Sequence, residues 1–407
     1  MEKLRLCFIL QLCVLAAAQK TFLDSPLNIR LYRQFRNWIF RNFGEHGEEG
    51  GRFLTKRRES VQENVPEDVP FPCNVTGGRS PEVPDSVHRL RPGDIDVIAA
   101  MGDSLTSGAG IFASNLLQVG IDNRGVAASG GGQGTWRTFL TLPNILKEFN
   151  PNLVGYAVGD SLTSQPASQL NVAEIGAMSR DMPFMAKYLI SKIKSDPRID
   201  VKKHWKLISL LIGSNDFCSE ICTAPSVSSI LEAHQVDLVK TLRILRDNLP
   251  RTFVTLHIPP HLKSLVVTRK GRNSLRCYTM TTLECPCLLA LQYRNRRPEY
   301  YDVMRRWQNL DEEIVNYPEF HKDDFTVVAL PVLKSTTIPL ATDGFSDLSY
   351  LSYDCFHITQ KGNARYANGI WNNLLEPFGN KTVAWSQPYE KFLCPTSERP
   401  FLATSKN

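Results

Sequence analysis

From Asp94 onward, apolar runs of strand length alternate with longer helical stretches, and this alternation constrains the fold more than any other feature. The runs at 96–101, 207–212, 252–258 and 325–330 are each followed by a glycine or a proline, and helical stretches lie at 182–194, 229–248 and 361–376. Continuous apolar runs suit strands that are buried on both faces of a parallel sheet. The alternation therefore predicts an α/β sandwich with a central parallel sheet. Functional groups of such sheets gather beyond the carboxyl ends of the strands.

The first residues have the pattern of a secretory signal peptide. Lys3 and Arg5 precede an apolar run from Leu6 to Ala18 that ends in small residues, so we predict a signal peptide over 1–18. The alternative is an N-terminal membrane anchor, but the run is short for a bilayer. With no later apolar run of spanning length, we expect a secreted, extracellular protein without an anchor.

Residues 19–90 are expected to form a helix, a linker and a lead-in to a main domain over 91–380, with a tail over 381–407. The helix is predicted at 27–43, where Ile29, Tyr32, Phe35, Trp38, Ile39 and Phe43 would share one face. That face either packs on the main domain or lies on a membrane surface. Glycine and charge over 44–63 predict a linker.

The net charge of +6 is small for 407 residues and arises largely from arginines and lysines in the first hundred residues. No basic stripe interleaved with aromatic residues runs through the rest of the chain. We therefore expect no nucleic-acid partner.

Eight cysteines remain after removal of the signal peptide, an even number that predicts disulfides in a secreted chain. A zinc site built from Cys285, Cys287, His257 and His261 is the alternative, but the spacing fits no common structural zinc pattern. No metal site is therefore expected. The sequons at Asn74 and Asn380 predict glycosylation, which agrees with secretion.

The segment Gly102-Asp103-Ser104-Leu105-Thr106 directly follows the first predicted strand. A serine there can present its hydroxyl at the top of the sheet and its backbone N–H to an oxyanion. The alternative is an ordinary helix N-cap, which favours Asp and Ser. The same five residues recur at 159–163, with Ser161 in the place of Ser104, so the string alone does not identify a nucleophile.

Two further motifs follow in order along the chain. Asn215, in Gly213-Ser214-Asn215-Asp216, comes after the second predicted strand and can donate to an oxyanion, although these are also common turn residues. Asp354 and His357 stand three residues apart before the last predicted helix. An imidazole is a suitable base for a serine, and a nearby carboxylate can orient it.

The order of these motifs resembles that of the GDSL or SGNH hydrolases. The resemblance implies a flavodoxin-like α/β/α fold, Ser104 as nucleophile, His357 as base and no cofactor. It also implies an oxyanion hole made by the N–H of Ser104, by Gly176 and by the side chain of Asn215. Over roughly residues 65–400 the chain resembles the phospholipase B subfamily more closely, in segments such as 141–151, 171–177, 204–218, 354–357 and 371–377.

The resemblance leaves the triad acid open between two residues. The general pattern of the family assigns the acid to Asp354, and its spacing to His357 favours it. For phospholipase B-type enzymes, Asp216 is the alternative. Between the two serines, Ser104 is favoured over Ser161. Pro166 follows Ser161 where the helix after a nucleophile would run, and proline disfavours helix at the residue before it.

The resemblance implies a secreted lipid esterase that hydrolyses phospholipids and lysophospholipids, and also glycerides and retinyl esters, at a transient membrane or micelle surface. One alternative is an esterase for short-chain or acetylated carbohydrate esters, and another is a lipid-binding protein without catalysis. Apolar residues that follow Ser104, namely Ile111, Phe112, Leu116 and Leu117, suit either a lipid chain or ordinary core packing.

Overall fold

The computed structural model describes residues 26–43, 59–269 and 274–407. The chain divides into two compact units, residues 1–45 and 46–407. The predicted signal peptide and most of the predicted linker lie outside the described residues. Within the described ranges, no helix combines the length and the apolar character that crossing a bilayer requires.

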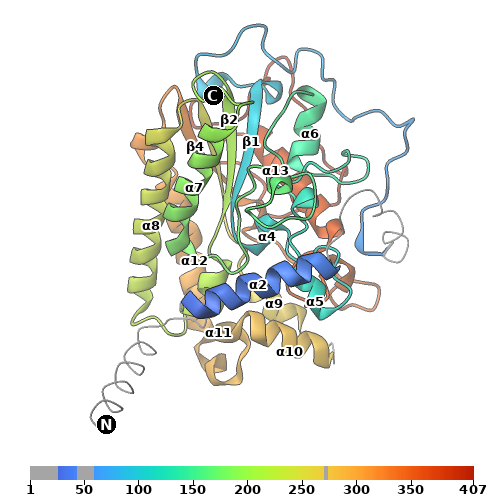
Figure 1. Ribbon diagram of the computed structural model, residues 1–407, viewed down its shortest axis with the longest axis vertical. Coiled ribbons are helices and arrows are strands. Elements are labelled where there is room, and N and C mark those ends of the chain that lie inside the picture. The colour runs from blue at the N-terminus through green and yellow to red at the C-terminus, as the bar shows by residue number, and fades with distance from the viewer. Residues whose placement is uncertain (1–25, 44–58, 270–273) are drawn as a thin grey trace. The chain divides into compact units, whose positions relative to one another are not determined.

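A four-stranded parallel sheet forms the centre of the larger unit (Figure 1). Its strands are β1 (Ile95–Gly102), β2 (Trp205–Leu211), β3 (Thr252–His257) and β4 (Phe325–Leu330), and they are hydrogen-bonded in the order β1-β2-β3-β4. These strands match the four predicted runs to within two residues at each end. The prediction of a parallel sheet is confirmed.

The free edge of β1 is covered by two short stretches of chain. The backbone N–H of Ile98 donates to the carbonyl of Val154 at 2.9 Å, and that of Ala100 donates to Leu170 at 3.1 Å. Val172 in turn donates to Ala100 at 2.8 Å. The residues between these stretches leave the sheet, and they include the second Gly-Asp-Ser-Leu-Thr string.

Helices cover both faces of the sheet (Figure 1). The α-helices of the larger unit are α4 (Ser104–Ser107), α5 (Leu116–Val119), α6 (Leu142–Phe149), α7 (Met182–Ser195), α8 (Val227–Asn248), α9 (Lys263–Thr268), α10 (Leu275–Glu284), α11 (Pro286–Leu289), α12 (Arg297–Ile314) and α13 (Gln360–Leu375). The predicted helices at 182–194, 229–248 and 361–376 correspond to α7, α8 and α13. The sequence did not lead us to expect α12, which packs against α8.

Alternate residues of each strand enter two separate hydrophobic cores. In β1, Ile98 lies in the core beneath α6 and α13, whereas Val97 and Ala99 lie in the core beneath α7 and α8. In β2, Leu207 and Ile208 divide in the same way. Burial on both faces explains the continuous apolar runs and gives the α/β/α sandwich that was expected.

The smaller unit contains helix α2 (Pro26–Phe43), whose bounds agree with the prediction. The predicted apolar face is not uniformly buried. Ile39 is buried, but Phe35 and Trp38 are each 49% exposed. Phe35 and Ile39 are one helical turn apart, so one edge of the predicted face is buried and the rest of it is exposed.

The eight cysteines that were predicted to form disulfides do so, in the pairs Cys73–Cys394, Cys218–Cys285, Cys222–Cys287 and Cys277–Cys355. Four bridges point to folding in an oxidising compartment. Cys285 and Cys287 are bonded to other cysteines and are not metal ligands. The described residues contain no cluster of three or more metal-ligating side chains.

Candidate active site

The chain makes a sharp turn where β1 ends at Gly102. Its φ is +145°, and a Cβ atom at this position would lie 2.1 Å from the carbonyl oxygen of Leu211 in β2. A side chain cannot be accommodated there, which explains the glycine. Asp103 then caps helix α4 by accepting a hydrogen bond from the backbone N–H of Leu105. Ser104 is the first residue of that helix, at the carboxyl end of the sheet.

Ser104, His357 and Asp354 form a continuous chain of hydrogen bonds. The hydroxyl of Ser104 lies 2.8 Å from Nε2 of His357, and Nδ1 of the same ring lies 2.5 Å from Asp354 Oδ2. All three residues are buried, and Ser104 retains an exposed fraction of 5%. The predicted Asp-x-x-His pair thus meets the first predicted serine through His357, which is 253 positions distant from it in the sequence.

Local backbone structure holds Asp354 in place. Its Oδ1 accepts the backbone N–H groups of Phe356 at 2.9 Å and His357 at 3.0 Å. Cys355 between them has a φ of +59° and is bridged to Cys277 of α10. Helix α13 begins soon after, capped by Thr359. A tight turn with a covalent tether therefore fixes the carboxylate under the ring.

The charges of His357 and Asp354 affect each other's pKa. Burial acts to lower the pKa of His357, but the carboxylate of Asp354 outweighs it, and the pKa is raised to about 9. Glu284 of α10 and Asp103 add to the same effect. Burial likewise acts to raise the pKa of Asp354, but the charge and hydrogen bond of His357 outweigh it and lower the pKa. The site thus favours an ion pair.

Asp216, the other candidate acid, contacts a different partner. It begins a short π-helix, Asp216–Glu220, and both of its carboxylate oxygens accept the backbone N–H of Ser179, at 3.2 and 3.3 Å. Burial raises the pKa of Asp216 to about 6, and His234 opposes this rise. The structure therefore places Asp354, and not Asp216, against His357.

A second buried polar chain supports the loop that contains Asp216. The hydroxyl of Ser179 lies 2.8 Å from Nδ1 of His234, and Nε2 of that ring lies 2.7 Å from Asp311 of α12. The ring of His234 stacks on Trp307 with a centroid distance of 3.6 Å. All four residues are buried, so these side chains cannot contact a substrate unless the core opens. Its effect is to fix Ser179 beneath Asp216.

The two predicted oxyanion donors other than Ser104 lie on neighbouring loops. The side-chain amide of Asn215 donates to the carbonyl of Ala177 at 2.9 Å, which leaves its second N–H available. The backbone N–H of Glu174 donates to Gly102, which anchors the same loop at the end of β1. Gly176 lies between these two anchors, is exposed and has a φ of +78°. Among the described backbone groups, its N–H has no acceptor.

A mostly apolar cavity of about 90 Å³ opens beside Ser104. Its lining comes from six stretches of the chain and comprises Ser104, Leu105, Ser214, Pro260, Leu262, Ser264, Leu265, Thr268, Leu333, Thr336, Ile338, Leu351, Phe356, Ile358 and Trp385. Ile111, Phe112, Leu116 and Leu117 are not among these residues. Ile111 is buried in a small separate cluster, and Leu116 and Leu117 are exposed.

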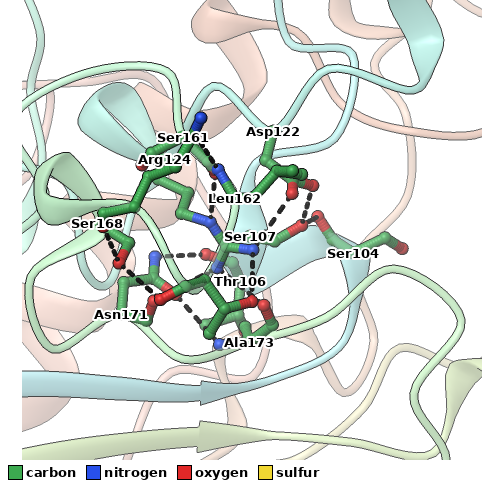
Figure 2. A network of polar contacts seen from close by, with 12 residues as sticks. Ser104, Thr106, Ser107, Asp122, Arg124, Ser161, Leu162, Ser168, Asn171 and Ala173 are labelled. Atoms are coloured by element: carbon green, nitrogen blue, oxygen red, sulfur yellow. Dashed lines mark hydrogen bonds and ion pairs between the residues drawn. The ribbon is translucent and has the colours of Figure 1, made fainter. Parts of the chain in front are cut away.

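Ser161 lies in a different environment from Ser104. Its hydroxyl donates to the carbonyl of Gly159 at 3.2 Å, and its own carbonyl accepts a hydrogen bond from Nε of Arg124 at 2.7 Å. No helix follows it, and the chain proceeds through turns to a single 3₁₀ turn at Pro166–Ser168. Figure 2 shows Ser161 on the far side of the buried Arg124 side chain from Ser104.

Sequence reasoning missed Arg124 and its partner Asp122. Both side chains are fully buried, and they form an ion pair at 3.0 Å. Oδ1 of Asp122 accepts the hydroxyl of Ser107 in α4 at 2.9 Å, and Arg124 donates to Asn171 and to the carbonyl of Ala173. The sequence offered one signal of this pair: Asp122 and Arg124 are two positions apart and are the only charged residues in the segment 111–136. The cavity lining was missed because its residues are scattered along the sequence.

Comparison with known proteins agrees with this arrangement of motifs. Residues 98–370 match the family model described as GDSL-like Lipase/Acylhydrolase. "Phospholipase B1, membrane-associated" from Rattus norvegicus is 39% identical over 331 residues, which cover 81% of this chain, and its Homo sapiens counterpart is 39% identical over 334 residues. The chain spans about a fifth of the length of these relatives, 22% in each case.

Solved structures also match at low identity. An acetyl xylan esterase from Geobacillus stearothermophilus is 14% identical, with a TM-score of 0.28, over 68% of this chain and 94% of its own. An extracellular lipase from Streptomyces rimosus is 14% identical, with a TM-score of 0.30, over 67% and 96%. The match of the family model to two thirds of the sequence shows that this chain belongs to the GDSL-like lipase/acylhydrolase family.

Proposed function

We propose that the protein is a serine esterase that hydrolyses the acyl esters of phospholipids and lysophospholipids. The observation that carries this proposal is the 2.8 Å contact between Ser104 Oγ and His357 Nε2 beside an apolar cavity. A hydroxyl within hydrogen-bond reach of an oriented imidazole is the arrangement that nucleophilic acyl transfer requires.

In the proposed mechanism, His357 removes the proton of Ser104 while Oγ attacks the ester carbonyl. The protonated ring then donates this proton to the alcohol that leaves, and an acyl-serine remains. Water, deprotonated by the same ring, attacks the acyl group and releases the carboxylic acid and the free serine. Asp354 holds Nδ1–H towards itself and stabilises the imidazolium.

The oxyanion of each tetrahedral intermediate would be held by the backbone N–H groups of Ser104 and Gly176 and by the side chain of Asn215. Support comes from the free donor capacity of Gly176 and Asn215 and from the two hydrogen bonds that anchor their loops. Donors that are fixed before the reaction lower the barrier because they need no reorganisation.

An acyl chain of the substrate would occupy the cavity beside Ser104. Leucine, isoleucine, proline and aromatic side chains dominate its lining, and transfer of hydrocarbon into such a site is favourable. Glycerides and retinyl esters share this acyl part and are proposed as further substrates. No cofactor has a role in the mechanism.

A fluorophosphonate probe tests the nucleophile, and a pair of substrates tests the specificity. We expect the purified protein to react with the probe and the Ser104→Ala variant to fail to do so. We also expect lysophosphatidylcholine to be hydrolysed faster than an acetylated xylo-oligosaccharide. Faster deacetylation would identify a carbohydrate esterase instead. Phospholipid binding without turnover at any pH would identify a lipid-binding protein.

We also propose that the protein is secreted and glycosylated. The four disulfides support the secretory route, and Asn74 and Asn380 are both exposed. A shift in electrophoretic mobility on treatment with an N-glycosidase, absent in the Asn74→Gln/Asn380→Gln variant, would test the modification.

A further inference from the structure

Helix α2 (Pro26–Phe43) has an unusual charge composition for a surface helix. Its 18 residues include four arginines and neither aspartate nor glutamate. Surface helices of soluble domains commonly carry both signs of charge, which pair along the helix. This helix instead carries a purely positive charge that no acidic residue of its own can neutralise.

The solvent-exposed side of α2 contains an apolar stripe. Leu27, Leu31, Phe35 and Trp38 are 63%, 52%, 49% and 49% exposed. Their spacing of four, four and three residues places them on one face of an α-helix. The rings of Phe35 and Trp38 stack with their centroids 6.2 Å apart, so the stripe is continuous at that end.

The stripe does not include every apolar residue of the helix. Phe40, with an exposed fraction of 1%, lies on the opposite side of the helix from the stripe, and Ile39, with 3%, lies at the edge of the stripe, one helical turn after Phe35. An amphipathic helix needs only one apolar face for packing within a protein. A row of four large apolar side chains in solvent marks an interaction surface.

Exposed arginines flank the stripe. Arg30 and Arg41 are exposed, as is Gln34 between them, and helical spacing puts these three residues on one line beside the apolar stripe. Large apolar side chains with an adjacent line of cations form the pattern of helices that lie in the interface of a bilayer.

We propose that α2 binds the surface of a bilayer that contains anionic phospholipids. Leu27, Leu31, Phe35 and Trp38 would insert at the boundary between headgroups and acyl chains, and Arg30 and Arg41 would contact the lipid phosphates. Tryptophan favours this boundary, and cations gain free energy from the negative surface potential of the bilayer. The helix would lie in the plane of the surface and would not cross it.

Charge complementarity favours this partner over a second copy of the chain. Two copies that joined through these faces would bring their arginine lines together, with no acidic residue on either helix to compensate. An anionic lipid surface satisfies the apolar stripe and the arginines at the same time. The proposal does not depend on the esterase chemistry, because it is argued from residues of α2 alone.

The experiment is flotation of the full chain with lipid vesicles. The Ser104→Ala variant is used as the parent protein, so that lipid hydrolysis cannot alter the vesicles. Vesicles of phosphatidylcholine alone are compared with vesicles that also contain phosphatidylserine, at low and high salt. We expect binding to the mixed vesicles that weakens with salt, and much weaker binding to phosphatidylcholine.

Three double variants separate the contributions. Leu31→Ser/Trp38→Ser should reduce binding to the mixed vesicles more than tenfold, since it removes two membrane-inserting side chains. Arg30→Gln/Arg41→Gln should reduce it about 25-fold, on the basis of about fivefold for each arginine near an anionic surface. The matched control, Gln34→Ala/Asn37→Ala, changes two exposed polar residues of the same helix and should bind as the parent does.

Equal binding to both kinds of vesicle, or unchanged binding of the Leu31→Ser/Trp38→Ser variant, would overturn the proposal. A change in molecular mass of that variant in lipid-free solution would also overturn it, because it would show that the stripe joins two copies. On the background with Ser104 intact, each variant should hydrolyse a soluble short-chain ester at the parental rate. That control separates loss of the membrane surface from loss of the folded enzyme.

Discussion

The five residues Gly-Asp-Ser-Leu-Thr occur twice in this chain, at 102–106 and at 159–163, and the two copies have different structures. The first copy follows a central strand and begins a helix. The second copy lies in the excursion between two short stretches that pair with the edge of β1, and no helix follows it. An identical local sequence therefore takes its structure from the element that precedes it.

The first residue of each copy shows the physical origin of the difference. A Cβ at Gly102 would collide with the backbone of β2, whereas a Cβ at Gly159 would have no atom within 4 Å. Gly102 thus permits a sharp turn against a neighbouring strand, and Ser104 emerges at the carboxyl end of the sheet. Ser161 bonds to the carbonyl of Gly159, two residues before it.

The two copies are nevertheless connected through one buried side chain. Arg124 donates to the carbonyl of Ser161 and pairs with Asp122, whose other oxygen accepts the hydroxyl of Ser107 in α4 (Figure 2). Asn171, a further partner of Arg124, donates to the carbonyl of Thr106 at 2.8 Å. The second copy therefore belongs to the support of the helix on which the first copy places its serine.

Replacement of each serine by alanine gives the sharpest contrast. Ser104→Ala should lower kcat for a soluble ester by about 10⁵- to 10⁶-fold, because it removes the proposed nucleophile. Ser161→Ala should leave kcat within about threefold, since it loses one hydrogen bond to a carbonyl near its own position. Steady-state kinetics with active-site titration would measure both. Comparable losses in the two variants would contradict the distinction between the copies.

The two candidate acids give the next largest contrast. Asp354→Asn should lower kcat by about 10⁴-fold, because the amide cannot hold His357 in the tautomer that accepts the proton of Ser104. Asp216→Asn should cost about tenfold, since its carbonyl oxygen can still accept the N–H of Ser179. Kinetics of the two purified variants with one soluble ester would measure the ratio. A greater loss for Asp216→Asn would transfer the role of the acid to Asp216.

The sheet and the order of the site motifs could be predicted from the sequence because both depend on local patterns. Strands buried on both faces are continuous apolar runs, and Ser104, Asn215 and His357 each stand next to such a run or a helix. The buried partners could not be predicted in this way. Arg124 meets Ser161, Asn171 and Ala173 only because the edge of β1 brings those residues together. The cavity lining comes from stretches that are far apart in the sequence, so no helical or strand periodicity reveals it.

Removal of the Arg124 guanidinium, which connects the two copies, should lower the stability of the fold. Arg124→Met leaves Asp122 buried without its ion-pair partner and should lower the free energy of unfolding by about 3–5 kcal/mol. The matched control is Arg198→Met, because Arg198 forms an ion pair with Asp196 at the surface, where such a pair contributes less than about 1 kcal/mol. Denaturant unfolding with the disulfides intact would measure both.

The double variant Arg124→Met/Asp122→Leu separates the two causes of that loss. Because it leaves no unpaired buried charge, it should recover part of the stability lost in the single variant. A single variant as stable as Arg198→Met would show that the connection between the two copies contributes little to the fold.

The smallest expected effect concerns the pH dependence that distinguishes Ser104 from Ser161. Only Ser104 contacts an ionisable base, and the nearby carboxylates raise the pKa of His357 to about 9. The ring acts as a base in its neutral form, so kcat/KM should rise between pH 7 and pH 9.

Glu284→Gln removes one of the charges that stabilise the imidazolium. It should therefore move the acid limb of the profile to lower pH by a few tenths of a unit and raise activity at pH 7 about twofold. Glu299→Gln, at an exposed ion pair of α12, is the control and should leave the profile unchanged. A shift of the limb to higher pH in Glu284→Gln would contradict the assignment of that limb to His357, because loss of a negative charge can only favour the neutral ring.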